Sequence, residues 1–316
     1  MRALRGVVLG ALTWLLAMGS ALAAAPDGRA ATGEAVMALG RDAVWTQVSA
    51  TPIGFDSFHA QGMVRVGDEF YVSSVEIMER SRRYPEPRGG FDRDQGEGQG
   101  WLFRMSAKGE LLASLKLGEG AIYHPGGLDF DGRFLWVPVA EYRPGGPSIV
   151  YRVDPRTMTA TEAFRVGDHI GAIAWDPAMR SLTGANWGGR AFYQWTFGAT
   201  GQTPRRTAGP TPNRAHYVDY QDCHGAGPRR MLCAGLADYQ GWLGRPSSTL
   251  GGMELIDLAD LRPLWQAPVQ ARSAAGVVMT SNPAFFEAIP GGVRGYFLPE
   301  EGRGTFYVYE ARPPAR

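Results

Sequence analysis

The sequence predicts an all-β protein that folds as a single β-propeller. The main observation is a repeated motif, in which a histidine opens a turn of small residues and a polar residue follows. Three copies span the same 17 positions, from His59 to Glu76, from His124 to Glu141 and from His169 to Asn186. Repetition at a period of about fifty residues is typical of propellers and solenoids.

Two further copies extend the series to five. The fourth starts at His216 and reaches Asp238 across an insertion of five residues, and the fifth lacks a histidine and runs from Ser273 to Glu300 and Glu301. Five copies predict five blades.

Each copy reads as a hairpin followed by further strands. Residues 63–66 and 69–73 flank the turn Gly67-Asp68, and residues 128–130 and 133–137 flank Asp131-Gly132. Such dipeptides between alternating apolar residues are a strong hairpin signal. Third strands are expected at 100–105, 148–153 and 191–195, and fourth strands at 111–117 and 161–166. Four antiparallel strands make one propeller blade.

The last blade needs a strand from the other end of the chain. Residues 304–310 form its third strand and the chain then ends, so residues 44–49 are expected to complete the blade and close the ring. Closure removes exposed sheet edges. Six blades remain an alternative, because residues 198–213 and 255–266 are hard to assign. The propeller domain is predicted to span residues 44–316.

The N-terminal part reads as an export signal. Residues 1–23 have a basic start, an apolar run and the small-residue site Ala21-Leu22-Ala23, which predicts a cleaved signal peptide and a periplasmic or secreted protein without a membrane anchor. Residues 24–43 form an N-terminal segment with a short helix expected at 35–39. The insertion at 78–98 is either a functional loop or a disordered one.

The charge and the cysteines narrow the function classes. The formal net charge is +1, and removal of Arg2 and Arg5 with the signal lowers it to −1, so nothing indicates nucleic-acid binding. In an oxidising compartment Cys223 and Cys233 are expected to form a structural disulfide across a hairpin, the alternative being a metal or redox pair. The sequence carries no signal for the oligomeric state.

The repeat places polar side chains on one face of the ring. Each histidine begins the first strand of a blade and the polar residue ends the second, so antiparallel pairing brings both to the same end of the blade. The histidines are His59, His124, His169 and His216, and the polar residues are Glu76, Glu141, Asn186, Asp238 and Glu301.

Three interpretations of this face stay open. The histidines stabilise tight loops between blades, or they hold a transition metal with carboxylates behind them, or the polar ring holds Ca²⁺ and a histidine acts as general base. Ca²⁺ is the favoured divalent metal, with Zn²⁺ or Fe as alternatives. His224 lies outside this register and is expected at the surface.

Aromatic residues and arginines follow the polar ring. Tyr142, Trp187 and Tyr239, with Arg143 and Arg190, suit a pocket for a small-molecule or anionic organic ligand. The alternative is that the aromatic residues pack between blades and the arginines pair with nearby acids.

Five stretches resemble an uncharacterised family of secreted β-propeller proteins, and the resemblance runs from about residue 45 to the C-terminus. They are 57–64, 70–76, 124–132, 136–144 and 168–171. The resemblance implies the propeller fold and no particular activity.

In layout the chain is distantly similar to calcium-dependent lactonases of the gluconolactonase and paraoxonase type. Their metal lies in a propeller channel on Glu, Asn and Asp side chains, which implies Glu76, Asn186 and Asp238 here. Those families have six blades, and the histidines depart from the gluconolactonase pattern. The four histidines are also similar in layout to those of carotenoid-cleaving oxygenases, which have seven blades and a longer chain. Fold does not imply function.

Together these observations predict a metal-dependent hydrolase of lactones or esters. Glu76, Glu141, Asn186, Asp238 and Glu301 would hold the metal, with His59 and His216 as further ligands; His124 or His169 would be the general base, and Arg143 and Arg190 would orient an anionic group. The alternative is a non-catalytic module that binds a ligand or a protein through the same face.

Overall fold

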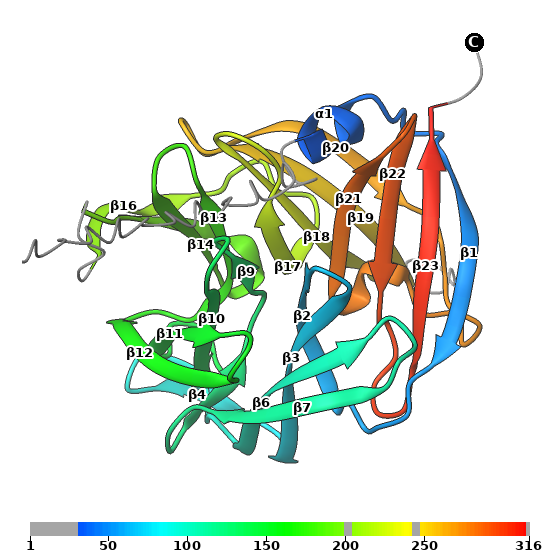
Figure 1. Ribbon diagram of the computed structural model, residues 1–316. Helices are drawn as coiled ribbons and strands as arrows, with labels where there is room; N and C mark the ends of the chain where they lie inside the picture. Colours follow the sequence, from blue (N-terminus) through cyan, green and yellow to red (C-terminus); the bar gives the residue numbers. More distant parts are fainter. Residues whose placement is uncertain (1–30, 199–203, 242–246, 314–316) are drawn as a thin grey trace, which may run out of the picture.

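The computed structural model describes residues 31–198, 204–241 and 247–313, and Figure 1 shows their strands grouped around a common axis. The predicted signal peptide lies outside the described residues. Five sheets form the blades: β2-β3-β6-β7, then β8 and β9 with β10-β11-β12, β13-β14-β15-β16, β17-β18-β19-β20 and β21-β22-β23-β1. The prediction of a five-bladed, all-β propeller is confirmed.

The innermost strands come first in each blade. They are β2 (His59–Val66), β8 (Ile122–Pro125) with β9 (Asp129–Phe130), β13 (Ile170–Asp176), β17 (Asp219–Gly225) and β21 (Ala284–Ile289). The second strands are β3 (Glu69–Glu79), β10 (Leu135–Glu141), β14 (Ser181–Asn186), β18 (Arg230–Tyr239) and β22 (Gly292–Phe297). The third strands are β6 (Glu97–Ser106), β11 (Ser148–Asp154), β15 (Ala191–Thr196), β19 (Ser248–Asp257) and β23 (Thr305–Arg312).

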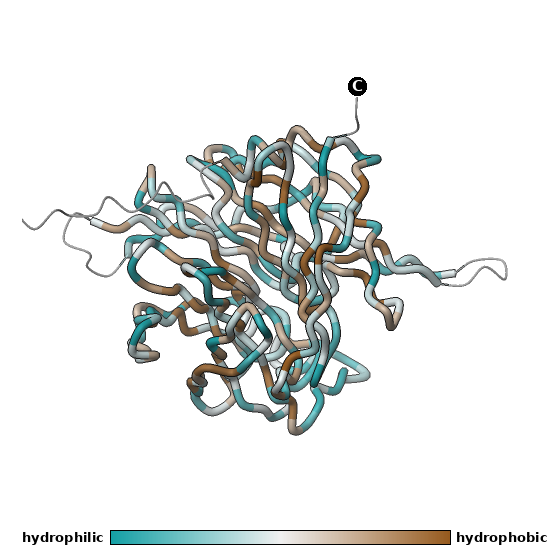
Figure 2. The backbone as a smooth tube through the Cα atoms, turned by 45° about the vertical axis from the view of Figure 1, so that its right-hand side comes forward, coloured by the Kyte–Doolittle hydropathy of each residue, from teal (hydrophilic) through white to brown (hydrophobic). Residues whose placement is uncertain are grey.

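The outermost strands are β7 (Leu111–Leu117), β12 (Thr159–Val166), β16 (Arg205–Pro212), β20 (Arg262–Val269) and β1 (Val44–Pro52). Two of them, β16 and β20, lie in regions that the sequence left unassigned, and both are outer strands of existing blades, so the described residues there form no sixth blade. Strands nearer the axis are more buried. Six successive residues of the second strand β10 are buried, whereas most residues of the outermost strand β7 are exposed or half-buried. Figure 2 shows hydrophobic and hydrophilic residues in alternation along the strands.

The ring closes by joining the two ends of the described chain. β1 pairs with β23 from Val44 opposite Arg312 to Pro52 opposite Thr305, as predicted from the sequence. Trp45 of β1 packs edge-on against Phe286 and Phe297 of the same blade, with ring centroids 6.0 Å apart. This apolar contact adds to the pairing, because aromatic pairs of this geometry are favourable beyond their buried area.

Three expectations about local structure need correction. The helix α1 (Thr32–Met37) begins before the predicted 35–39 and lies at the end of β17, where Gly33 donates a hydrogen bond to the Ala226 carbonyl. The fifth inner strand starts at Ala284, so the Ser273 turn precedes the blade. The insertion at 78–98 contains the hairpin β4 (Arg83–Arg88) and β5 (Phe91–Arg93). No helix in the described part of the chain is long and apolar enough to cross a membrane.

The small residues of the repeated motif allow neighbouring inner strands to touch. Gly127 donates to the carbonyl of Gly171 at 2.8 Å, and Ile173 donates back to the carbonyl of Gly127 at 3.1 Å. A Cβ on Gly126 would lie 2.1 Å from the Gly171 oxygen, and one on Gly127 would lie 2.5 Å from Asp222 Oδ1. Side chains at these positions would therefore force the blades apart.

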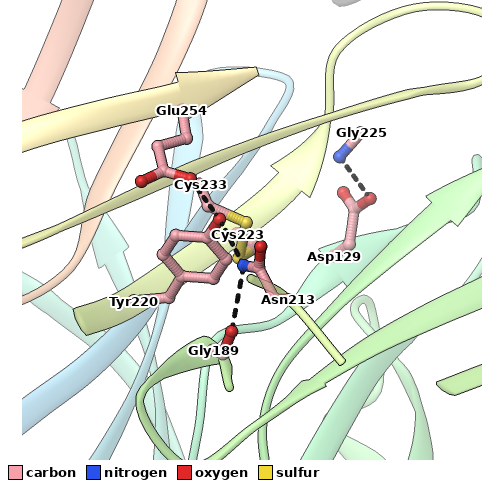
Figure 3. The surroundings of a disulfide bond; sticks show 8 residues. All are labelled: Asp129, Gly189, Asn213, Tyr220, Cys223, Gly225, Cys233 and Glu254. Atoms are coloured by element: carbon pink, nitrogen blue, oxygen red, sulfur yellow. Dashed lines mark hydrogen bonds between the residues drawn. A yellow bond between two sulfur atoms is a disulfide. The ribbon is translucent and has the colours of Figure 1, made fainter. Parts of the chain in front are cut away.

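Two buried aspartates join the inner strands of different blades. Asp222 of β17 accepts from Met63 N of β2 at 2.7 Å, and its carboxylate also interacts with the backbone N–H of Ala284 in β21. Asp129 of β9 accepts from Trp175 N of β13 at 2.7 Å and from Gly225 N of β17 at 2.8 Å. Figure 3 shows the second contact to Gly225. These two carboxylates thus connect all five blades.

His224 is not at the surface, and that expectation was wrong. It is 1% exposed, its Nδ1 donates to the Gly225 carbonyl at 3.0 Å, and its Nε2 accepts from Phe286 N at 3.2 Å. The alternation that turns Cys223 to one side of β17 turns His224 toward β21. Its neighbour Cys223 forms the predicted disulfide with Cys233, directly opposite on β18. Both cysteines are fully buried.

Replacing Asp222 by alanine is expected to destabilise the whole ring. The substitution leaves the buried Met63 N–H of another blade without its acceptor, at a cost of about 1–3 kcal/mol. We expect a loss of about that size in the free energy of unfolding, measured by urea denaturation. Asp68→Ala is the control, since the Asp68 side chain is fully exposed. Equal stability of the two variants would contradict the proposed role of Asp222.

Candidate functional site

A polar pocket of about 190 Å³ opens where the inner strands begin, on the face opposite α1. Three of the predicted histidines line it, and Tyr142 and Trp187 form part of its wall. The other lining residues are Gln61, Gly171, Gly188, Asp219, Tyr220 and Gln221. The sequence prediction that this face brings histidines together is thus met for three of the four.

His124 lies at the centre of the group. Its ring centroid is 6.4 Å from that of His59 and 5.8 Å from that of His169, and the Tyr142 ring stacks on it at 4.3 Å. The side chain is 5% exposed, and neither ring nitrogen has a hydrogen-bond partner in the described structure. Burial holds the pKa of His124 well below its usual value, and the neighbouring histidines lower it further. The ring is therefore neutral, with a donor and an acceptor both unused.

His169 has a defined tautomer. Its Nδ1 lies 2.8 Å from the carbonyl oxygen of Glu141, so Nδ1 carries the proton and Nε2 carries the lone pair. Trp187 meets the ring edge-on at 4.7 Å. Burial lowers the pKa of His169 to about 4. A hydrogen bond that fixes the tautomer is a common way of orienting a functional histidine.

His59 interacts with an acid of another blade. Its Nδ1 lies 3.0 Å from Glu301 Oε1, an ion-pair distance without the alignment of a full hydrogen bond. Burial lowers the pKa of His59, and the Glu301 carboxylate opposes that shift in part. His59 is therefore the histidine of the pocket with a carboxylate partner.

The fourth histidine does not belong to the group. His216 precedes β17, and its Nδ1 bonds to the Asn213 carbonyl at 2.8 Å, outside the pocket. Strand pairing shows why: Ala60, Ile170 and Tyr220 each stand just before a bulge in their inner strand. The residue before them is His59, His169 and Asp219 respectively. In this blade Asp219 occupies the histidine position, and the five-residue insertion misled the sequence alignment.

Equal spacing in the sequence also did not mean equal register. A two-residue turn joins Val66 to Glu69 in the first blade, while four residues separate Asp176 from Ser181 in the third. Glu76 therefore lies one residue beyond the partner of His59, whereas Asn186 pairs with Ile170. The same interval of 17 residues therefore arises from different turn lengths and different strand lengths in the two blades, and its ends do not occupy equivalent positions.

The predicted metal ligands have other partners. Glu76 accepts from the Trp101 indole at 3.1 Å, and Glu141 pairs with Arg143 at 2.6 Å. Asn186 donates to Asp168 at 3.1 Å and accepts from Ala191 N at 2.7 Å. Asp238 accepts from Thr249 at 2.6 Å at an exposed position away from the pocket. Glu301 is exposed beside His59.

A shared metal shell does not form from these residues. Within residues 31–198, 204–241 and 247–313, no group of three or more His, Cys, Asp or Glu side chains is arranged to hold a metal ion. Ca²⁺ takes six to eight oxygen ligands, and the carboxylates and amide predicted for it point to different places. The residues do not fit the calcium site expected from the sequence. A bound Ca²⁺, Zn²⁺ or Fe ion stays a prediction that metal analysis of the purified protein can test.

Only some of the predicted ligand-binding residues line the pocket. Tyr142 and Trp187 line the pocket, whereas Tyr239 is 51% exposed and lies outside it. Arg143 is bound to Glu141, and Arg190 pairs with Asp219 at 2.6 Å. Both arginines are paired with nearby acids, as the alternative interpretation from the sequence expected, and their role towards a ligand stays a prediction.

Four pocket residues were missed: Gln61, Asp219, Tyr220 and Gln221. Two of them, Gln61 and Gln221, stand at the bulges of β2 and β17, and bulges are frequent beside active sites. The sequence did carry a signal for the two glutamines, because each follows the residue that opens its inner strand by two positions. Tyr220 is held from behind, because its hydroxyl lies 2.5 Å from Glu254 Oε2 and accepts from Asn213 at 2.9 Å. Figure 3 shows this network beside the disulfide.

The insertion contributes to the rim of the pocket. Its hairpin is held at the base by Ser81, which donates to the Asp94 carbonyl at 2.6 Å. Arg93 lies over the Trp187 ring at 5.3 Å from its centroid, and Phe91 lies under the Arg143 guanidinium at 3.5 Å. The segment that the sequence left as functional or disordered is ordered in its hairpin and packs against the pocket wall.

Comparison with known proteins gives the family. Residues 30–313 match a family of unknown function, DUF6454, and the chain belongs to it. No curated protein matches the chain in sequence.

Solved structures give distant similarities. A luciferin-regenerating enzyme has a TM-score of 0.45 at 10% identity, covering 86% of this chain and 96% of that one. A hypothetical protein from Leishmania major has a TM-score of 0.42 at 10% identity, covering 85% and 91%. At this level neither similarity informs the chemistry of the pocket.

The histidine environment makes a testable prediction about pH. The pKa of His169 in the folded protein, about 4, lies below the value of 6.5 for a free histidine. Between these values the unfolded chain binds a proton that the folded chain does not, so stability is full above pH 6.5 and falls as the pH drops toward 4. Nitrogen-15 NMR of the imidazole is expected to show the Nδ1–H tautomer of His169 down to about pH 4. A protonated ring at pH 6 would contradict the assignment.

Proposed function

We propose that this member of the family is a hydrolase of small esters or lactones, and that the histidine-lined pocket is its active site. The observation that supports the proposal is His124, a buried imidazole with two unpartnered nitrogens. A buried polar group without a partner costs about 1–3 kcal/mol. Such a group within a pocket is accounted for when a ligand or a reacting water supplies the missing hydrogen bonds.

The two buried histidines suit complementary roles. His169 has its lone pair on Nε2, so it can take a proton from the water that attacks the carbonyl carbon and return it to the alcohol oxygen that leaves when the acyl C–O bond breaks. His124 has one N–H, which can donate to the carbonyl oxygen on which negative charge develops. The ring centroids are 5.8 Å apart, close enough for both to contact one acyl group. Both rings are neutral near pH 7, the state that each role requires.

The low pKa of His169 limits the substrates. A general base is most effective when its pKa is near the working pH. A base with a pKa of about 4 is weak, so we expect activated acyl compounds such as strained lactones and aryl esters to react. The rate is expected to be constant above pH 5 and to fall as the pH drops through about 4.

The scheme uses residues of the chain alone. The predicted dependence on a divalent metal is tested separately, by measuring activity after chelation and after adding Ca²⁺, Zn²⁺ or Fe²⁺. The alternative, a non-catalytic binding module, makes use of the same pocket without turnover.

His124→Ala is the decisive variant. Loss of a hydrogen-bond donor to the developing oxyanion costs about 100-fold in kcat, so we expect at least that loss with aryl acetates and small lactones. His216→Ala is the matched control, because His216 lies outside the pocket. Absence of hydrolysis by the unmodified protein, or equal rates for the two variants, would overturn the proposal.

Export is a separate proposal that the disulfide supports. A fully buried disulfide is typical of proteins that fold in an oxidising compartment. Mass spectrometry of the protein from its native host is expected to show a chain that begins at Ala24, with Cys223 and Cys233 oxidised. A chain that retains residues 1–23 in the cytoplasm would contradict both the signal peptide and the periplasmic or secreted location.

A further inference from the structure

The strand β5 of the insertion contacts the pocket wall at two points without lining the pocket itself. The Arg143 guanidinium carbon lies 3.5 Å from the centroid of the Phe91 ring, and the Arg93 guanidinium carbon lies 5.3 Å from the centroid of the Trp187 ring. Neither Phe91 nor Arg93 is among the residues that line the pocket. Both contacts lead to the same histidine, His169, by separate routes.

The first route runs from Phe91 through Arg143 and Glu141. Arg143 holds the Glu141 carboxylate with Nε and with a terminal guanidinium nitrogen, each 2.6 Å from Oε2, and the two side chains are only 15% and 12% exposed. The Arg143 N–H also donates to the Glu141 carbonyl at 2.8 Å, and the same oxygen accepts from Nδ1 of His169 at 2.8 Å. The acceptor that sets the tautomer of His169 is thus held by Arg143 twice, through its side chain and through its backbone.

Phe91 holds the guanidinium of Arg143 against the loop that follows β10. An arginine over an aromatic face is attracted by the negative face of the ring, and the attraction is stronger where water is excluded. Within the loop, the N–H of Glu141 donates to the Pro147 carbonyl at 3.0 Å. A Cβ on Gly145 would lie 4.0 Å from a carbon of the Phe91 ring, so the ring lies beside the loop as well as its arginine. Removal of the ring would free both.

The second route runs from Arg93 through Trp187. Two hydrogen bonds to Asp92, at 3.0 and 2.8 Å, hold the Arg93 guanidinium, which lies over the indole. The indole meets the His169 ring edge-on with the ring centroids 4.7 Å apart. This contact restricts rotation of the imidazole, whereas the Glu141 carbonyl selects which nitrogen carries the proton. The two routes therefore complement each other.

We propose that β5 is the positioning element of the pocket, and that Phe91, acting through Arg143 and Glu141, keeps the proton of His169 on Nδ1 and its lone pair on Nε2. The partner of one ring nitrogen decides the protonation of the other. Phe91 and Arg143 touch no reacting atom in this scheme, so both are positioning residues. The inference rests on the proposed function for the role of His169 as a base, but its tautomer is measured without turnover.

Phe91→Ala tests the first route and leaves the ion pair of Arg143 and Glu141 in place. We expect nitrogen-15 NMR at pH 7 to show a second species of His169 protonated on Nε2, because the Glu141 carbonyl no longer holds one position. With aryl acetates kcat should fall at least about tenfold at unchanged KM, since misplacement by about 1 Å costs up to about 100-fold. Phe91→Tyr keeps the ring and should retain both the tautomer and the rate.

Tyr84→Ala is the matched control. Tyr84 lies in β4 of the same hairpin and also has an arginine over its ring, Arg88, at 4.9 Å from the centroid. This arginine is not part of the pocket wall, so the His169 signals should stay as they are. Unchanged His169 signals in Phe91→Ala, or equal changes in Phe91→Ala and Tyr84→Ala, would overturn the inference.

Arg143→Gln and Glu141→Gln distinguish positioning from direct contact with a ligand. If Arg143 acts through Glu141, the two single variants and the double variant should change the His169 tautomer and kcat to the same extent, because effects within one network do not add. Unchanged His169 signals in Arg143→Gln, with a raised KM for anionic esters alone, would overturn the inference. Absence of hydrolysis by the unmodified protein would reject the proposed reaction, while the NMR comparison would still decide how His169 is positioned.

Discussion

The inner strands of this propeller meet through two buried carboxylates, and the other features depend on that contact. Asp222 connects β17 to β2 and β21, and Asp129 connects β9 to β13 and β17. The contact is close enough that glycine is required at position 127. Because these carboxylates and the backbone hydrogen bonds of Gly127 fix the inner strands against one another, the residues that begin those strands are fixed as well. His59, His124 and His169 come together for this reason.

Close packing at the axis also sets the chemistry of the pocket. The strands exclude water from His124 and His169, and desolvation keeps both rings neutral. The carboxylates on the same face are drawn to cations instead, as Glu141 is to Arg143 and Asp219 to Arg190. The result is a pocket with neutral hydrogen-bonding groups inside and charged groups at its rim.

The insertion at 78–98 packs beside the pocket but is not one of the four strands of its blade. The hairpin of β4 and β5 lies between β3 and β6, and it places Arg93 over Trp187 of the pocket wall and Phe91 against Arg143. Insertions at strand ends commonly carry specificity on a rigid scaffold. The blades hold the histidines in place through backbone pairing, while the insertion packs side chains against the pocket wall from outside the blades.

The sequence by itself determined the all-β class, the five blades, the closing strand β1 and the pairing of Cys223 with Cys233. These follow from alternation, turn residues and repetition, which act over a few positions. It also indicated His59, His124 and His169, since they open strands of the same kind. Only the tertiary structure decided that His216 lies outside the pocket, that Asp219 takes its position, and that His224 is buried. Turn lengths and bulges shift the register by one or two residues, and the partner of a charged side chain such as Glu76 or Arg143 depends on which strand folds beside it. Neither is visible in the spacing of the residues along the chain.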